Sequence, residues 1–410
     1  MALSVLQKLQ FLMLISAAAA FAMFAEMPRW RPAEIGRHWI PKATGFLIVI
    51  AVLGTPMSIY PGRSARFLWE SYAVTVTLAV LAWGIARTPH GVRLIARIFS
   101  SSVLVTCIMA YVMNRRDRDG RLGGAYTYDS NDLALMAGVA VPLMLWWALD
   151  RASKHRWVPI VGIPICIKIV MMSGSRGGFL GLGMVAVGLV IVGMAAGRGR
   201  LRSLGLMLGV GALLSFPLLP THVQQRFLSI GDENDYNLTS VTGRKAVWTR
   251  GVGYMMDNPL LGVGIDNFRT AEGRISAIGQ ERGSTGRGFK WSAAHNSFLQ
   301  VGAELGLVAG VVFFATMACI PVALLRKYKR MRMAATAAGR SNVDHFPALL
   351  AVAVMSFNVT GFFLSQGYGD TVYLLLAMSA AVLMQKDPLA RPPVVQPAQP
   401  RRLRQRMRAR

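Results

Sequence analysis

The sequence is short of charge, of acidic residues and of cysteine. Only 16% of its 410 residues are charged and 53% are hydrophobic, which is too apolar for an ordinary soluble domain. GxSxG, HExxH and P-loop motifs are missing, and so is any internal repeat. The three cysteines, Cys107, Cys166 and Cys319, lie inside apolar runs. They offer neither a disulfide framework nor metal-ligand spacing, and we expect them to fill the core.

Apolar runs of about 20 residues recur along the chain, and each is long enough to cross a bilayer. We predict an all-α, polytopic integral membrane protein of about 11 (10–12) transmembrane helices, with one long extracytoplasmic loop containing short helices. The predicted parts are an N-terminal transmembrane bundle (1–219), a periplasmic loop or cap (220–293), C-terminal transmembrane helices (294–385) and a basic cytoplasmic tail (386–410). The alanine-rich run Phe11–Phe24 is expected to remain as an anchor.

The net charge of +26 is concentrated in short loops and in the tail. Basic short loops face the cytoplasm, which assigns Arg87–Arg97, Arg151–Arg156, Arg198–Arg202 and Arg326–Arg340 to that side. Two basic segments, Asn114–Ser130 and Pro220–Ala293, then fall on the outer face. They are either solvated surface or cations kept for an anionic ligand such as phosphate. Within the second segment, Thr242 is predicted to cap a helix over Gly243–Asp257 that ends before Pro259.

Three polar residues are predicted to share the outer face. His295, followed by Asn296, begins an apolar run that lasts to Leu325. The positive end of a helix disfavours imidazolium, and a neutral imidazole suits a general base. Arg176 stands among glycines and serines between two apolar runs, and Arg244 begins the predicted helix of the cap. The alternatives are a capping or packing histidine, a snorkelling Arg176 and a solvated Arg244. Lys168, inside an apolar run, either lines the same cavity or pairs with an acid such as Asp132.

The order and spacing of four segments resemble the bacterial O-antigen ligase and O-antigen polymerase superfamily. The segments are Arg121–Ala134 (RLGGAYTYDSNDLA), Ser173–Leu180 (SGSRGGFL), Gly243–Trp248 (GRKAVW) leading to Asp257–Gly264 (DNPLLGVG), and Ala294–Gly310 (AHNSFLQVGAELGLVAG). The resemblance covers roughly Arg121–Leu325 and adds Arg121 and Asn131 as possible supporting residues beside Asn296 and Lys168.

The resemblance implies a glycosyltransferase of the bacterial inner membrane that needs no metal or other cofactor and acts at the periplasmic face. Its donor would be a glycan on undecaprenyl diphosphate, and its acceptor lipid A–core, another glycan or a protein. Arg176 and Arg244 would bind the diphosphate, and His295 would activate the acceptor hydroxyl. No nucleic acid is expected. An O-antigen or exopolysaccharide polymerase with the same chemistry is the alternative. Two alternatives come from other functional classes. One is a transporter or flippase for a lipid or polysaccharide, and the other is a structural membrane partner.

Overall fold

The computed structural model describes residues 38–114, 116–117, 120–123, 129–195, 199–219, 221–228, 239–285, 291–339 and 343–385. Within these ranges the chain forms helices and turns, and the β-structure amounts to one isolated antiparallel bridge between Arg116 and Leu122. The predicted all-α class is confirmed. The apolar run at 11–26 and the basic tail 386–410 lie outside the described residues.

Five described segments are long and apolar enough to cross a membrane, which agrees with a multi-pass membrane protein. They are α5 (Pro61–Phe67) continued through the π-helical turn η2 (Leu68–Tyr72) into α6 (Ala73–Ile85), α7 (Pro89–Met113), α8 (Ser130–Leu149), α10 (Arg176–Ala195) and α18 (Leu307–Ala337). Shorter apolar helices are α4 (Trp39–Gly54), α9 (Trp157–Met172), α11 (Gly199–Ser215), α19 (Phe346–Gly361) and α20 (Asp370–Met384). The number of about 11 crossings stays a prediction.

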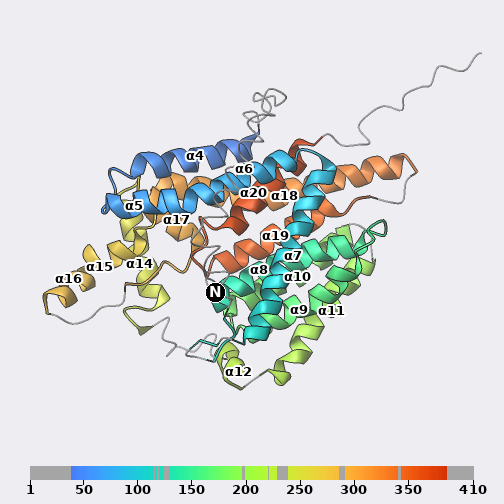
Figure 1. Cartoon of the computed structure of the whole chain (residues 1–410), viewed down its shortest axis with the longest axis horizontal. Coiled ribbons are helices and arrows are strands. Elements are labelled where there is room, and N and C mark those ends of the chain that lie inside the picture. The colour runs from blue at the N-terminus through green and yellow to red at the C-terminus, as the bar shows by residue number, and fades with distance from the viewer. Residues whose placement is uncertain are drawn as a thin grey trace, which may run out of the picture.

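The almost wholly buried helix α19 lies at the centre of the bundle, against α8, α10 and α18 (Figure 1). Small residues let α10 approach it closely. A Cβ added at Gly181 would lie 2.0 Å from Thr360 Oγ1 of α19. Backbones in membrane bundles pack this closely only where glycine or another small residue stands at the contact. The glycine-rich sequence of α10 therefore fixes its place against α19.

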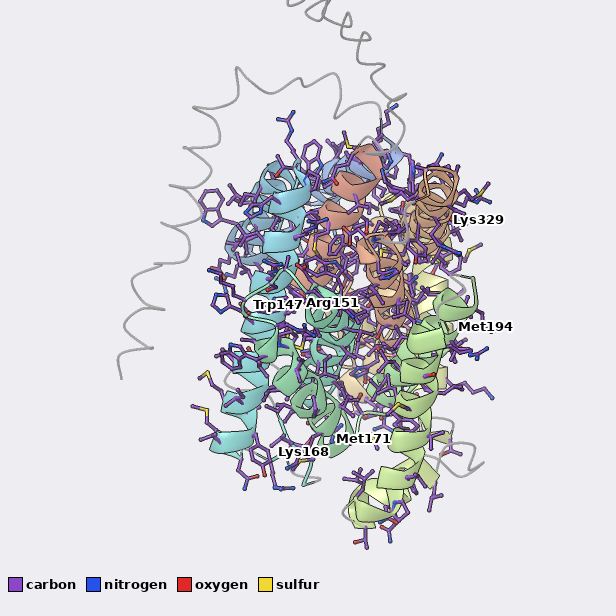
Figure 2. The ribbon with its side chains drawn as sticks, turned by 90° about the vertical axis from the view of Figure 1, so that its right-hand side faces the viewer. Trp147, Arg151, Lys168, Met171, Met194 and Lys329 are labelled. Atoms are coloured by element: carbon purple, nitrogen blue, oxygen red, sulfur yellow. The ribbon has the colours of Figure 1, made fainter. Side chains whose placement is uncertain are left out.

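Successive helices carry the chain between two ends of the bundle. In Figure 2, Arg151 after α8, Met194 near the end of α10 and Lys329 on α18 lie above Lys168 and Met171, which belong to the last turns of α9. The turns that follow α8 and α10 thus lie apart from the turn that follows α9. This alternation fits the pattern of basic loops in the sequence, and which end faces the cytoplasm stays a prediction.

The segment 220–293 contains four described short helices. They are α12 (Thr221–Leu228), which follows the short 3₁₀ turn η3 (Phe216–Leu218), α14 (Arg244–Asp257), α15 (Phe268–Arg274) and α16 (Ala277–Ser284). The predicted helix before Pro259 is confirmed as α14. Its predicted cap at Thr242 is wrong. Gly243 is the N-cap, while the Thr242 hydroxyl lies 3.2 Å from that of Ser240.

The apolar run that begins at His295 is two helices and not one. The short helix α17 (Ser297–Leu305) ends at Gly306, whose φ of 93° breaks the helical path before α18 begins at Leu307. A side chain at Gly306 would collide with the backbone of Leu260, 2.6 Å away, so only glycine fits this junction. His295 therefore precedes a short helix, and the apolar run from His295 to Leu325 does not form one continuous helix.

Two of the three cysteines fill the core as expected. Cys107 and Cys166 are buried, whereas Cys319 is exposed on the outer side of α18. The expectation of a core residue is wrong for Cys319, because an apolar run on a lipid-facing helix does not distinguish its buried side from its outer side.

Candidate functional site

The turn between α19 and α20 joins the parts of the molecule that carry the predicted site residues. This turn, residues 362–369, is held by α17. The Ser297 hydroxyl donates to the Leu364 carbonyl at 2.7 Å and accepts from the Gln366 N–H at 3.0 Å. Because one buried hydroxyl satisfies two backbone groups, the turn is fixed relative to α17.

Arg176 and Arg244 each begin a helix whose first residues lie near Phe363 of this turn. Arg176 is the first residue of α10, and a Cβ added at the next residue, Gly177, would lie 3.0 Å from the Phe363 Cβ. Arg244 is the first residue of α14, and its guanidinium carbon lies 5.8 Å from the centre of the Phe363 ring. Helix N-termini attract anions through unpaired N–H groups and the helix dipole. The N-termini of α10 and α14, each with an arginine as its first residue, therefore both lie beside Phe363.

His295 contacts the same turn at Ser365. Its N–H donates to the Ser365 hydroxyl at 2.8 Å, and its φ of 46° is left-handed. Such a backbone persists in a non-glycine residue only where the surroundings hold it, and it is common at functional sites. Asn296 is the N-cap of α17, with its side-chain oxygen accepting from the N–H groups of Phe298 and Leu299 at 3.0 Å each. Asn296 therefore fixes the start of α17 directly after the half-buried His295.

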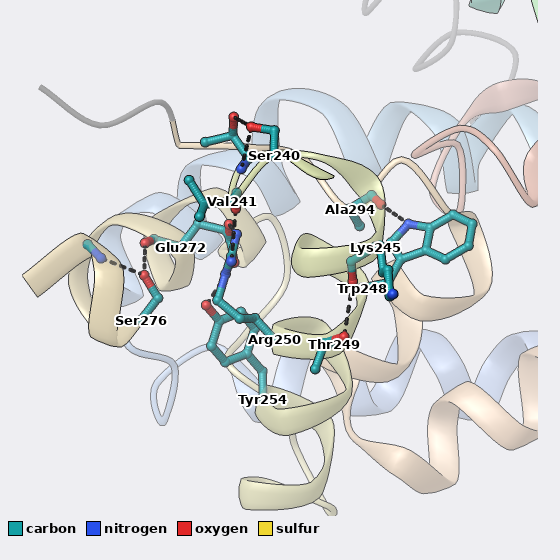
Figure 3. A network of polar contacts seen from close by, with 12 residues as sticks. Ser240, Val241, Lys245, Trp248, Thr249, Arg250, Tyr254, Glu272, Ser276 and Ala294 are labelled. Carbon is teal, nitrogen blue, oxygen red and sulfur yellow. Dashed lines mark hydrogen bonds and ion pairs between the residues drawn. The ribbon is translucent and has the colours of Figure 1, made fainter. Parts of the chain in front are cut away.

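The helix α14 is fastened on both sides (Figure 3). Toward the turn, the Trp248 indole N–H donates to the Ala294 carbonyl at 2.8 Å, and its ring meets Phe362 edge-on. Away from the turn, Arg250 forms a two-point ion pair with Glu272 of α15, at 2.8 and 2.5 Å. This pairing raises the pKa of Arg250. The Tyr254 hydroxyl also donates to Glu272 at 2.9 Å. These contacts hold Arg244 and His295 in one rigid unit.

A cavity of about 860 Å³ opens beside the turn and is lined by Ala294 and Ser365, the direct neighbours of His295 in sequence and in contact. Its polar lining includes Arg63, Asp132, Asp266, Arg269 and Gln366, and also Thr75 of α6 and Thr106 of α7. Its apolar lining follows α6 and α7 and includes Leu78, Leu81, Ile98, Phe99 and Val103. A cavity lined by both polar and apolar side chains suits an amphipathic ligand such as a membrane lipid.

A second hollow, of about 340 Å³, begins on Phe362 and Phe363 and has no polar surface. It continues along Phe298, Phe314 and Ala318 between α17, α18 and α19. Since Phe363 also faces Arg244, this hollow offers an apolar surface directly beside a cation. The turn therefore borders two hollows, the larger one with charged and apolar lining and the smaller one wholly apolar.

The supporting residues divide into two groups. Arg121 forms an ion pair with Asp117 at 2.6 Å in a small hairpin that contacts the end of α9 through Leu122, and Asn131 stands in the first turn of α8. Lys168 forms the second group, away from the cavity. It is exposed, and its ammonium donates to the Tyr111 hydroxyl at 3.2 Å. The expected pairing of Lys168 with Asp132 is wrong, because Asp132 accepts from Gln366 at 2.6 Å instead. Nor does Lys168 line the cavity.

The buried carboxyl group of Glu304, which no sequence pattern singled out, organises the cavity wall. It accepts from the N–H groups of Phe268 at 3.0 Å and Asp266 at 3.1 Å. Asp266 has a left-handed φ of 59° and pairs with Arg63 at 2.9 Å. Burial raises the pKa of Glu304 to about 8. An acid inside an apolar stretch is the signal that would have found it, since such residues are rare without a function or a partner.

The comparison with known families matches residues 161–314 to a model described as O-antigen ligase. No curated protein sequence matches the chain. The matched range begins within α9, includes Arg176, Arg244 and His295, and ends within α18. The resemblance to the O-antigen ligase and polymerase superfamily that the sequence showed is thereby confirmed over residues 161–314.

Proposed function

We propose that this protein transfers a glycan from undecaprenyl diphosphate to an acceptor hydroxyl, as an O-antigen ligase, at the periplasmic face of a bacterial inner membrane. The observation that carries the proposal is the convergence of Arg176, Arg244 and His295 on one turn, residues 362–369, beside a cavity with a charged lining and an apolar hollow. The family match supports glycosyl transfer of the ligase or polymerase type.

The donor diphosphate would lie between Arg176 and Arg244, at the N-terminal ends of α10 and α14. Its prenyl chain would follow the apolar hollow of Phe362, Phe363 and Phe314, which starts beside Arg244. As the glycosidic bond breaks, negative charge grows on the diphosphate oxygens. Fixed cations and helix N-termini then stabilise the transition state more than the bound donor.

The acceptor would approach from the 860 Å³ cavity, whose wall includes the residue before His295. The hydroxyl oxygen bonds to the anomeric carbon, and the bond from that carbon to the diphosphate oxygen breaks. The hydroxyl proton passes to the His295 imidazole, and the lipid diphosphate leaves with the bonding electrons. Attack opposite the leaving group would invert the anomeric centre, and NMR of the product reports whether it does.

Reconstitution in proteoliposomes with a lipid-linked oligosaccharide tests this proposal. With lipid A–core as acceptor, we expect a glycosylated product, with and without EDTA. His295→Ala is expected to abolish transfer with donor binding retained, while Arg176→Ala and Arg244→Ala should weaken donor binding. Lys168→Ala is the matched control, because it removes one cation outside the site, and its activity should equal that of the wild type.

The same experiment separates the alternatives. Product formed from the lipid-linked donor alone, with donor units joined to each other, would assign a polymerase. Transfer to no acceptor, together with movement of the intact lipid-linked glycan across the bilayer, would replace the enzyme with a flippase. Full activity of His295→Ala would reject the histidine as the base.

A further inference from the structure

A basic groove lies near the last turns of α18, away from the cap. It has a volume of about 560 Å³ and lies between the beginning of α4, the later half of α18 and the end of α20. Arg326, Lys329 and Arg330 supply its charge, and Trp39, Met333 and Leu383 supply much of its apolar surface. The groove is lined by three permanent cations and by no acidic side chain.

The three cations share one face of α18. Residues three and four apart are neighbours on a helix, so Arg326 is flanked by both Lys329 and Arg330. The two residues between them point inward. Lys327 and Tyr328 are buried, the Lys327 ammonium donating to the Gln385 carbonyl and the Tyr328 hydroxyl pairing with His345 at 2.8 Å. Figure 2 shows Lys329 at the edge of the bundle.

Positive charge is concentrated on this face of α18. Within the described residues, Arg326, Lys329 and Arg330 form no ion pair with an acidic side chain. Like charges four residues apart on a helix disfavour it by a few tenths of a kcal/mol in isolation. A groove that gathers such charges beside an exposed tryptophan is suited to an anion with an apolar body.

The length of α18 sets the depth of the groove. Its apolar part, Leu307–Leu325, is followed directly by Arg326. At about 1.5 Å per residue that part spans nearly the hydrocarbon thickness of a bilayer, about 30 Å. Arg326 therefore stands at the level of the lipid phosphates. Trp39 begins α4 beside it, and tryptophan is enriched at this interface.

We propose that this groove binds the headgroup of an anionic phospholipid, its phosphate held by Arg326, Lys329 and Arg330 and its acyl chains lying on Trp39 and Leu383. Basic pockets between transmembrane helices suit such lipids. The site is on the opposite side of the bilayer from the candidate glycosyl-transfer site. It does not depend on the proposed function.

Native mass spectrometry of the full chain, released from nanodiscs of phosphatidylethanolamine with added diphosphatidylglycerol, tests the site. The triple variant Arg326→Gln, Lys329→Gln, Arg330→Gln should lose diphosphatidylglycerol affinity by at least about tenfold, since each interfacial cation contributes on the order of a fewfold to binding. The triple variant Arg151→Gln, Lys154→Gln, Arg156→Gln is the control. It removes equal charge from the turn between α8 and α9, and its affinity should be unchanged.

The outcomes are distinct. Equal loss in both triple variants would mean attraction by net charge alone, and unchanged binding in the first would remove the groove as the site. Arg326→Lys with Arg330→Lys keeps the charge and should retain the lipid. Displacement of the lipid by inorganic phosphate at millimolar concentration would assign the groove to a soluble anion and overturn the lipid assignment.

Discussion

Removal of the Glu272 carboxylate should loosen the cap without unfolding the membrane bundle. Glu272 has no exposed surface, accepts two hydrogen bonds from Arg250 at 2.8 and 2.5 Å and a third from Tyr254 at 2.9 Å. Glu272→Ala leaves the Arg250 charge, 20% exposed, without its partner. Breaking a buried ion pair costs about 3–5 kcal/mol. At 1.4 kcal/mol per factor of ten, local opening of α14 and α15 should rise by about 10²- to 10⁴-fold.

Hydrogen–deuterium exchange of the protein in nanodiscs measures that opening peptide by peptide. Peptides from α14 and α15 should lose protection in Glu272→Ala, while peptides from α8 and α19 should not. Arg66 and Glu70 provide the control, because this pair is 3.9 Å apart with both side chains more than 60% exposed. Glu70→Ala should change protection by less than about 1 kcal/mol.

Replacement of the pair by apolar residues completes the cycle. Arg250→Met with Glu272→Leu should restore much of the protection, since an apolar pair of similar volume often substitutes for a buried ion pair. Unchanged exchange of α14 in Glu272→Ala would refute the reasoning, because it would mean that the ion pair does not hold the cap. Equal loss of protection across the whole molecule would refute the separation of cap from bundle.

Gly181→Leu should lower the melting temperature through a clash with Thr360 that costs about 1–3 kcal/mol. Gly183→Leu is the control and should leave the melting temperature unchanged, because no atom lies within 4 Å of a Cβ added at Gly183. Equal melting temperatures of the two variants would contradict the close contact between α10 and α19. Trp248→Phe removes one hydrogen bond, worth about 1 kcal/mol, to the carbonyl before the candidate base, and should lower kcat more than it raises donor KM; an unchanged kcat would separate this contact from catalysis. Because burial raises the pKa of Glu304 to about 8, the folded protein keeps a proton that the unfolded chain releases near pH 4.5, so this contribution to stability is full at low pH and is lost as pH rises through 8. Glu304→Gln should flatten that part of the curve of melting temperature against pH, and an undiminished slope would assign it to another group.

The sequence predicted the features that depend on local composition. Helical class, the apolar runs and the helix before Pro259 follow from residue type, spacing and the restriction that proline places on its neighbour. The break at Gly306 was missed because a glycine in an apolar run is usually tolerated within the helix. Here the backbone of Leu260, far away in sequence, decides the outcome.

The candidate site was predictable in part. Arg176, Arg244 and His295 stood out as polar groups at the ends of apolar runs. Their meeting at Phe363 and Ser365 depends on how α19 packs against α10, which no local pattern specifies. Lys168 was misplaced for the same reason. The sequence showed a lysine inside an apolar run. It did not show that Lys168 lies on the exposed side of α9, where Tyr111 is its partner.

The turn between α19 and α20 has a consequence for how the protein can be divided. Residues 362–369 lie outside the range that matches the family model, 161–314, and so does Arg63 on the cavity wall. A fragment cut at the ends of the matched range would keep both arginines and the histidine and lose the aromatic and hydroxyl groups that gather them. The matched range and the candidate site therefore overlap without coinciding. Exchange of this domain between relatives should succeed only when the turn is exchanged with it.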